Sequence, residues 1–177
     1  MAPPHGRLSG RAMLRVGHLI LLSVGTQLPF DRLVRTVDDW AIATGRSDVV
    51  AQIGPSTYVP RSLKAFPFLA PQAFQELQLN ATIMISHAGM GSILTALEYG
   101  KPIIIMARDH RRGEHRNGHQ LATAERFKAV PGIYVASDEF SLVEHLTRLA
   151  ELTGSERLSP HAPASFTDRL RDFILRP

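Results

Sequence analysis

The stretch from residue 82 to residue 107, TIMISHAGMGSILTALEYGKPIIIMA, constrains the fold more than any other part of the chain. It begins with an apolar, β-branched run at 82–85 that suits a buried strand. A turn of small residues follows at 86–92, and then a helical spacing of apolar residues that ends at Gly100. Because another apolar run occupies 103–106, the segment predicts a strand, a helix and a second strand in that order.

The glycine-rich turn at 86–92 predicts an anion site. It places backbone N–H groups at a helix N-terminus, beside the carboxyl end of a strand, where open α/β sheets bind anions and most often phosphate. Gly89 and Gly91 allow a ligand to approach the backbone closely. The alternative is that both glycines only permit tight packing of the helix on the strand. We favour the phosphate interpretation.

The rest of the chain repeats the alternation of strands and helices. Apolar runs predict further strands at 16–24, 48–53, 65–69 and 133–135, and helical spacing predicts helices at 29–45, 71–80, 119–128, 138–152 and 166–175. This order predicts an α/β fold, a Rossmann-like parallel sheet with helices on both faces. In a parallel sheet Gly25 and Thr26, which end the first strand, lie at the same edge as the central turn and form the other wall of its pocket.

Length and composition bound the possibilities. The 177 residues suffice for one domain, which we place at 16–153, after an extension at 1–15 that we expect to be disordered and before a linker and C-terminal helix at 154–177. The absence of cysteine excludes disulfides and thiolate metal sites. A net charge of +4 suits an anionic ligand, nucleic acid or an acidic membrane surface, or is simply a solvated basic surface.

Two features bear on location. No apolar run approaches the roughly 20 residues of a membrane span. The hydrophobic run at 16–24 follows a basic N-terminus but lacks a small-residue cleavage site, so we interpret it as a strand rather than a signal peptide. We therefore expect a cytoplasmic protein whose membrane association comes from a partner.

Four arginines lie within the nine residues from 108 to 116, close to the predicted phosphate site: Arg108, Arg111, Arg112 and Arg116. Guanidinium groups bind carboxylates and phosphates through paired hydrogen bonds, so this loop is a candidate substrate contact. A solvated loop or a docking surface for a partner protein are the alternatives.

Three segments carry a resemblance to a known family. SHAGMGSILTALEYGKP followed by NGHQLA resembles the C-terminal, nucleotide-sugar-binding domain of GT-B glycosyltransferases. It is most similar to the branch that contains the peptidoglycan N-acetylglucosaminyltransferase and the catalytic subunit of the dolichol-linked chitobiose transferase. SVGTQLPFDRLVRTVDDWA resembles the catalytic subunit of two-subunit bacterial exopolysaccharide glucuronosyltransferases. The resemblance covers residues 16 to 150 and implies a single GT-B C-terminal-type domain that binds a nucleotide sugar.

The resemblance also implies residue roles. Contacts to the UDP diphosphate fall on Gly25, Thr26, His87, Ala88, Gly89, Met90, Gly91 and Ser92. Ser92 is expected to cap the helix, to bind a phosphate oxygen, or both. Many such enzymes bind ribose through a glutamate where this chain has Thr95, and Glu98 lies three residues later on the same helix face, so either residue is a candidate. Contacts to the sugar fall on Arg108, Arg112, Arg116, Asn117, His119 and Gln120, and Asn117 is also placed to cap the helix that follows.

The implied reaction is an inverting transfer from a UDP-sugar to a lipid-linked saccharide in exopolysaccharide biosynthesis. UDP-glucuronate is the first candidate donor, with UDP-N-acetylglucosamine and UDP-galactose as alternatives. We assign no general base in this chain, since in such enzymes it comes from the acceptor-binding half, here a separate membrane-anchored subunit. We expect no metal or other cofactor and no nucleic acid partner, and recruitment to the inner face of the plasma membrane. A non-catalytic nucleotide-binding module and an epimerase fragment are the rival functions.

Overall fold

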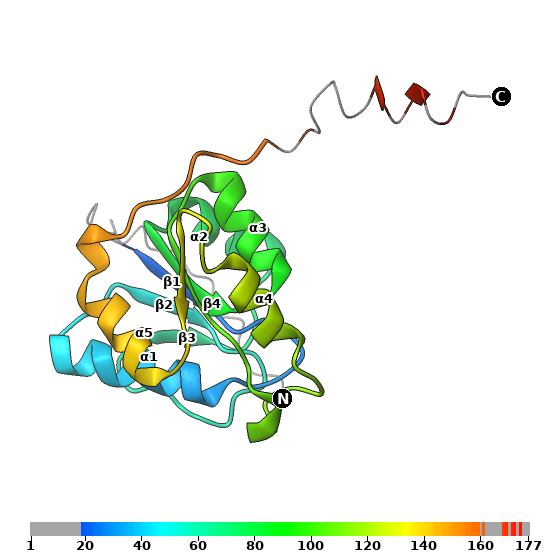
Figure 1. Ribbon diagram of the computed structural model, residues 1–177. Helices are drawn as coiled ribbons and strands as arrows, with labels where there is room; N and C mark the ends of the chain where they lie inside the picture. Colours follow the sequence, from blue (N-terminus) through cyan, green and yellow to red (C-terminus); the bar gives the residue numbers. More distant parts are fainter. Residues whose placement is uncertain (1–18, 160, 162–167, 170, 173, 175–177) are drawn as a thin grey trace, which may run out of the picture.

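The computed structural model describes residues 19–159, 161, 168–169, 171–172 and 174 (Figure 1). The extension predicted at 1–15 and the first residues of the predicted strand, 16–18, lie outside these. Of the helix predicted at 166–175, the described residues 168, 169, 171, 172 and 174 have helical backbone, and the other positions also lie outside the described part.

A six-stranded sheet forms the centre of the domain, and all its strand pairs are parallel, which confirms the predicted fold class. The strands lie in the order β3-β2-β1-β4-β5-β6. Their bounds are β1 (Ile20–Ser23), β2 (Val49–Gln52), β3 (Lys64–Phe66), β4 (Ile83–His87), β5 (Ile103–Met106) and β6 (Ile133–Ala136).

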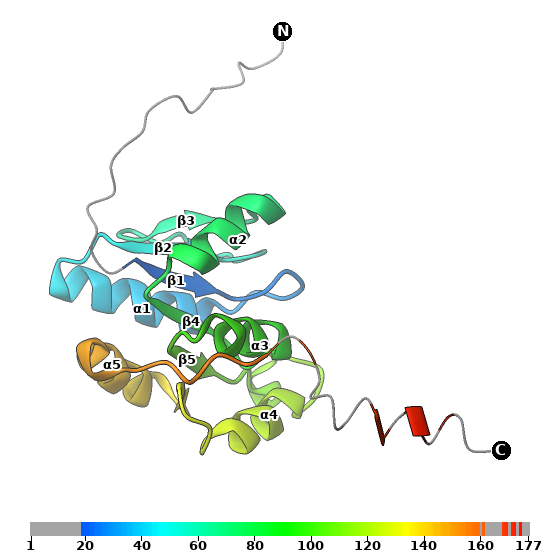
Figure 2. The same ribbon diagram turned by 90° about the horizontal axis from the view of Figure 1, so that it is seen from above.

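Helices cover both faces of this sheet (Figures 1 and 2). The helices α1 (Asp31–Thr44) and α5 (Glu139–Thr147) pack on one face. The other face carries α2 (Pro71–Asn80), α3 (Met90–Tyr99) and α4 (His119–Phe127). Two short 3-10 turns complete the described elements, at His110–Arg112 and Leu149–Glu151.

Burial of the central strands explains why this sequence forms such a sheet. All four residues of β1 are buried, and Ile20 and Leu22 belong to the core under α1 and α5 whereas Leu21 belongs to the core on the opposite face. A parallel strand that is covered on both faces reads as a continuous apolar run, as β1 and β5 do. Each such side chain contributes roughly 1.5–3 kcal/mol of burial.

Several predicted boundaries were wrong by a few residues. β4 continues to His87 and α3 begins at Met90, whereas the apolar pattern predicted the strand end at 85 and the helix start at 93. The first turn of α3 has no buried apolar side chain, so periodicity could not detect it. The strand predicted at 65–69 ends at Phe66, since Pro67 lacks an N–H group for the ladder. The helix predicted at 138–152 ends at Thr147 and continues as a 3-10 turn.

The connection between β2 and β3 has no helix and depends instead on the buried carboxylate of Asp38. This side chain accepts hydrogen bonds from the Tyr58 hydroxyl at 2.7 Å and from the backbone N–H groups of Arg61, Ser62 and Leu63 at 2.9, 2.9 and 3.2 Å. Burial raises the pKa of Asp38, but the four hydrogen bonds outweigh burial and leave the pKa below its ordinary value.

In the described part of the chain no helix combines the length and the apolar character that crossing a bilayer requires.

We predict that Asp38→Asn lowers the free energy of unfolding by about 3 kcal/mol, because the amide replaces an acceptor oxygen with a donor that faces N–H groups. Urea unfolding at pH 7 measures the loss. The folded pKa of Asp38 is lowered, so the carboxylate stabilises the protein above the unfolded value of about pH 4, and this contribution is lost as the pH falls through the folded value.

The neighbouring Asp39→Asn is the control for this substitution, since Asp39 is exposed and the ion pair recorded for it among the described residues is with exposed Arg61. It should change the free energy of unfolding by less than about 0.5 kcal/mol. Equal effects of the two substitutions at pH 7 would contradict the role given to Asp38.

Candidate functional site

The site lies where the order of the sheet reverses. β1 pairs with β2 on one side and with β4 on the other, and the connections that leave β1 and β4 diverge from this point. Ser23 and Ser86 stand in register at the ends of these two strands, and the Ser86 hydroxyl donates to the Ser23 carbonyl at 2.9 Å. Open α/β sheets bind ligands in the crevice beyond such a switch point.

The ring of His87 lies between Gly25 and Gly89, which belong to the two walls of this crevice. A Cβ atom at Gly89 would lie 2.3 Å from the His87 Nε2 atom, and one at Gly25 would lie 3.0 Å from the Cε1 atom. Gly25 also has a φ of +79°, which disfavours a side chain there. The imidazole therefore packs against both glycines, and a side chain at 89 would displace it.

The two glycines of the turn have different reasons to be glycine. Gly89 is required by the His87 ring, so part of the packing alternative is correct for this position. A Cβ at Gly91 would meet nothing within 4 Å, and the residue is exposed. Open space in front of Gly91 is what the approach of a ligand needs.

Unpaired backbone donors line the start of α3. Gly89 is the residue before the helix and has an extended backbone, and no side chain caps the first turn. Within the described residues, the N–H groups of Met90, Gly91 and Ser92 have no recorded acceptor. Together with the helix dipole, these N–H groups favour an anion at this position. Ser92 is the third residue of the helix, so the prediction that it caps α3 was wrong.

His87 is neutral at physiological pH. Burial is the main cause that lowers its pKa to about 4, and the positive charge of Arg108 and the proximity of His115 lower it further, against a hydrogen bond with the Ser23 backbone. The Ser86 hydroxyl lies 3.3 Å from the Nδ1 atom. A neutral imidazole has one donor and one acceptor nitrogen, so it can offer a ligand a hydrogen bond but no full charge.

Arg108 does not face the crevice, contrary to the prediction that it contacts the sugar. Its side chain is buried, with 2% of the residue exposed, and the guanidinium donates to the backbone carbonyls of Val24, Leu28 and Pro29. Burial lowers the pKa of Arg108 to about 10, so the group remains positively charged at neutral pH. No charge pattern in the sequence distinguishes this inward arginine from its neighbours.

The other arginines of the loop lie at the surface. Arg111 pairs with Asp109 at 2.8 Å, and Arg112 pairs with Glu139 at 3.4 Å, so each of these two has an acidic neighbour. Arg116 is exposed, and no acidic partner is recorded for it in the described part of the chain. Among the arginines predicted to contact the sugar, Arg116 is therefore the one whose guanidinium is exposed and forms no ion pair with an acidic side chain in the described part of the chain.

An ion pair that sequence reasoning missed holds this loop against α1. Arg32 makes a two-point contact with Glu114 at 2.7 and 2.8 Å, and Glu114 also accepts from the backbone N–H of Asp109 at 2.8 Å. Arg32 and Glu114 are 82 residues apart. From the sequence, the helical periodicity places Arg32 on the polar face of its helix but does not indicate a partner.

The predicted sugar contacts at the start of α4 directly follow this loop in the chain. The Gln120 side chain accepts from the backbone N–H of Arg108 at 3.1 Å, and His119 is exposed. Gly118 is the residue that precedes α4, not Asn117, although the Asn117 side chain accepts from the His119 N–H at 3.3 Å. The capping role predicted for Asn117 is thus correct in function and wrong by one position.

The two ribose candidates differ in location. Thr95 is half-buried in the middle of α3, whereas Glu98 is exposed at its far end. Glu98 lines a groove of about 450 Å³ with Leu79, Lys101 and Arg157. It lies eight residues after Met90, which is about 12 Å along a helix axis, so the structure does not bring Glu98 to the crevice.

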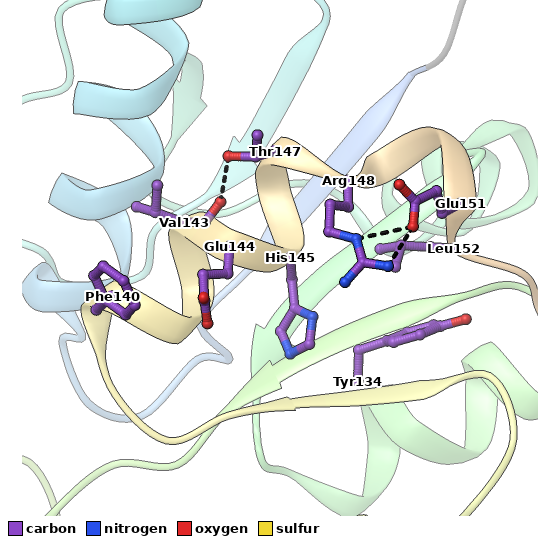
Figure 3. Close-up of a pocket in the computed structure, with 9 residues that line it drawn as sticks. All are labelled: Tyr134, Phe140, Val143, Glu144, His145, Thr147, Arg148, Glu151 and Leu152. Atoms are coloured by element: carbon purple, nitrogen blue, oxygen red, sulfur yellow. Dashed lines mark hydrogen bonds and ion pairs between the residues drawn. The ribbon is translucent and has the colours of Figure 1, made fainter.

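A second groove, of about 470 Å³, runs along α5 and also lies away from the predicted residues (Figure 3). Several of its polar groups are occupied within the protein, as Arg148 bonds to Glu151 and the His145 ring contacts the Val135 carbonyl at 3.3 Å. In the described residues no group of three or more histidine or acidic side chains is arranged to hold a metal ion.

Comparison with known proteins identifies the family. The profile of the glycosyltransferase family 28 C-terminal domain matches residues 19–175, which is most of the chain. The chain belongs to this family. The domain described above is thus a family 28 domain, in agreement with the resemblance of the central motifs to glycosyltransferases of the GT-B type.

Curated relatives of this family 28 domain include the UDP-N-acetylglucosamine transferase subunit ALG13. The mouse protein is 28% identical over 155 residues, which cover 81% of this chain and 13% of the relative. The protein of Eremothecium gossypii is 31% identical over 100 residues, or 55% of this chain and 46% of the relative. The chain therefore spans less than half the length of these relatives.

Two solved structures share the fold. The solution structure of ALG13 has a TM-score of 0.56 at 20% identity, with 86% of this chain and 94% of that chain covered. Acinetobacter baumannii MurG has a TM-score of 0.57 at 17% identity, with 77% of this chain and 43% of that chain covered.

We predict that Gly89→Ala lowers the free energy of unfolding by about 1–2 kcal/mol, because the new Cβ displaces the His87 ring. When His87 is also replaced by alanine, Gly89→Ala should lower the free energy of unfolding by about 1 kcal/mol less than it does in the wild type. A double-mutant cycle followed by chemical unfolding measures this coupling between positions 87 and 89. Gly91→Ala is the control, since open space and helix propensity make it neutral or stabilising by up to about 0.5 kcal/mol. Additive effects at 87 and 89 would contradict the packing described.

His87 should also make the protein acid-sensitive. Its folded pKa lies below the unfolded value of about 6.5, so the unfolded chain binds a proton first and stability falls as the pH drops from about 6.5 to about 4. The lost free energy is roughly 3 kcal/mol. Urea titration at several pH values measures the unfolding free energy of the wild type and of His87→Gln. The wild-type value minus the variant value should decrease as the pH falls from about 6.5 to about 4. A constant difference would refute the buried neutral ring.

Proposed function

We propose that this chain is the donor-binding, catalytic subunit of a two-component inverting glycosyltransferase that uses a UDP-sugar. The observation that carries the proposal is the start of α3, at the switch point of a family 28 domain. There the N–H groups of three consecutive residues have no acceptor among the described residues, and a Cβ at Gly91 would meet no atom within 4 Å. Gly25, Thr26 and the turn from His87 to Ser92 surround the diphosphate.

The chain's contribution to the reaction is positioning and stabilisation of the leaving group. As the bond from the anomeric carbon to UDP breaks, negative charge grows on the diphosphate, and the fixed N–H dipoles of α3 are already aligned to receive it. A neutral His87 donates a hydrogen bond without a proton transfer. Thr95 is the nearer of the two ribose candidates, and Asn117, His119 and Gln120 extend from the same edge toward the sugar.

The acceptor and the general base belong to a partner. The curated relatives are named as subunits of a transferase, and this domain matches one half of the MurG chain. The acceptor hydroxyl must lose its proton during attack, and we assign that proton to a group on a membrane-anchored subunit. That partner would hold this chain at the cytoplasmic face of the membrane and present a lipid-linked saccharide for exopolysaccharide synthesis.

The first candidate donor is UDP-N-acetylglucosamine, which the names of the relatives at 28–31% identity support. UDP-glucuronate is the second. Its extra carboxylate suits Arg116, the exposed guanidinium of the loop that is not engaged by a described acidic group. With Arg108 turned inward and Arg112 beside Glu139, the loop offers such a carboxylate fewer free cations than its composition indicates.

The anion site is tested by Met90→Pro, which removes one of the three donor N–H groups. Proline fits the first position of a helix, and the extended backbone of Gly89 suits a residue that precedes proline. We expect the affinity for UDP, measured by calorimetry, to fall about five- to tenfold while thermal stability is retained. Met90→Ala keeps the N–H and should bind UDP within about twofold of the wild type. Equal affinities of all three proteins would remove α3 from the diphosphate site.

The donor is identified by transfer assays. Membranes that contain the chain with its co-expressed partner are supplied with labelled UDP-N-acetylglucosamine, UDP-glucuronate or UDP-galactose, and the labelled lipid product is measured. Transfer from one donor identifies it. Tight UDP binding without transfer from any of the three would favour a nucleotide-binding module without catalysis.

A further inference from the structure

Arg108 is one of two charged residues buried in the described part of the chain, and the other is Asp38. A buried cation is costly unless its donors are satisfied. All the hydrogen bonds recorded for the guanidinium of Arg108 go to carbonyl oxygens of a single segment, the β1–α1 loop at 24–30, with distances of 2.8 Å to Leu28 and 2.5 Å to Pro29 and a further bond to Val24.

This loop is the second wall of the crevice. Val24 precedes Gly25, which packs against the His87 ring, and the opposite contact of the ring is with Gly89 at the start of α3. A continuous series of contacts therefore leads from the buried guanidinium to the unpaired N–H groups. Any movement of the 24–30 loop moves the surface that faces α3 across the crevice.

Both ends of Arg108 are held in place. The guanidinium carbon lies 5.0 Å from the centre of the Phe30 ring, and the Gln120 side chain accepts from the backbone N–H of Arg108. The residue thereby joins the β1–α1 loop to the start of α4. Its hydrogen-bond partners are carbonyls rather than a carboxylate. The charge of Glu114 is near enough to raise the pKa of Arg108, and the positive charge of Arg108 in turn helps to lower the pKa of His87 in the crevice.

We propose that Arg108 is a positioning residue of the donor site: its buried guanidinium fixes the 24–30 loop as the rigid second wall of the crevice and places a permanent positive charge behind the bound diphosphate. The proposal rests on the proposed function, since it assumes that a nucleoside diphosphate binds there. It replaces the direct sugar contact that the sequence predicted for this residue.

A residue that only stabilised the fold would affect all ligands of the site equally. A residue that positions the diphosphate wall acts on the phosphates and spares the nucleoside. The decisive quantity is therefore the ratio of the affinity for UDP to the affinity for uridine, each measured by titration of the intact chain with NMR or calorimetric detection.

We expect Arg108→Met to lower UDP affinity by at least about tenfold and uridine affinity by less than about twofold. Arg108→Lys keeps the charge but replaces the planar fork with one nitrogen, so it should lose about three- to fivefold for UDP. Hydrogen exchange should increase in the 24–30 loop of both variants and remain unchanged in α5. Arg148→Met is the matched control, because Arg148 is an exposed arginine directly after α5 that pairs with Glu151, and it should preserve both affinities.

The outcomes separate the two proposals. A wild-type chain that does not bind UDP overturns the proposed function and this inference with it. A wild-type chain that binds UDP, with variants whose affinities for UDP and uridine are unchanged or fall together, overturns the positioning role alone. If Arg108→Met does not fold, the same ratio measured for Arg108→Lys decides.

Discussion

The domain depends on the burial of a parallel sheet on both faces. Because helices cover each side, the central strands are mostly apolar, and their buried polar side chains gather near the carboxyl ends. Gln52 ends β2, and Ser23 and Ser86 lie at or next to the ends of β1 and β4. The pairing of β1 with β4 brings these two ends together where the sheet order reverses. A core built in this way leaves one edge where polar groups can gather, and the crevice occupies that edge.

At this edge the chain uses packing and backbone polarity more than exposed charge. The His87 ring between Gly25 and Gly89 sets the separation of the two walls, and its burial keeps it neutral. Under the two proposals, the positive potential comes from the N–H groups of α3 and from Arg108, which is buried against the β1–α1 loop. Both sources are fixed in position before a ligand arrives, which is the condition under which dipoles and charges stabilise developing charge most effectively.

The sequence predicted the fold class, which the parallel sheet confirms, because the fold class depends on local patterns. The same patterns place the candidate site at the carboxyl ends of β1 and β4, and this placement stays a prediction. Apolar runs marked the strands, and Gly100 marked the end of α3, where it has a φ of +65°. The sequence could not predict which way Arg108 points or that Arg32 pairs with Glu114, since such contacts join segments about 80 residues apart in the chain. It also missed the first turn of α3, which is defined by backbone geometry and not by apolar side chains. The sequence thus located the charged loop, but it could not predict which of its arginines is buried and which are exposed.

This division bears on what kind of anion the domain can distinguish. Four exposed arginines would attract any polyanion through a field that salt screens, with little dependence on shape. The structure instead buries one guanidinium, places acidic groups beside two others and leaves a crevice whose donors point in fixed directions. Under the proposed function, a site of this kind binds a compact diphosphate by geometry, and its affinity depends less on salt than that of a basic patch. The net charge of +4 is then a weaker guide to the ligand than the position of a single buried arginine.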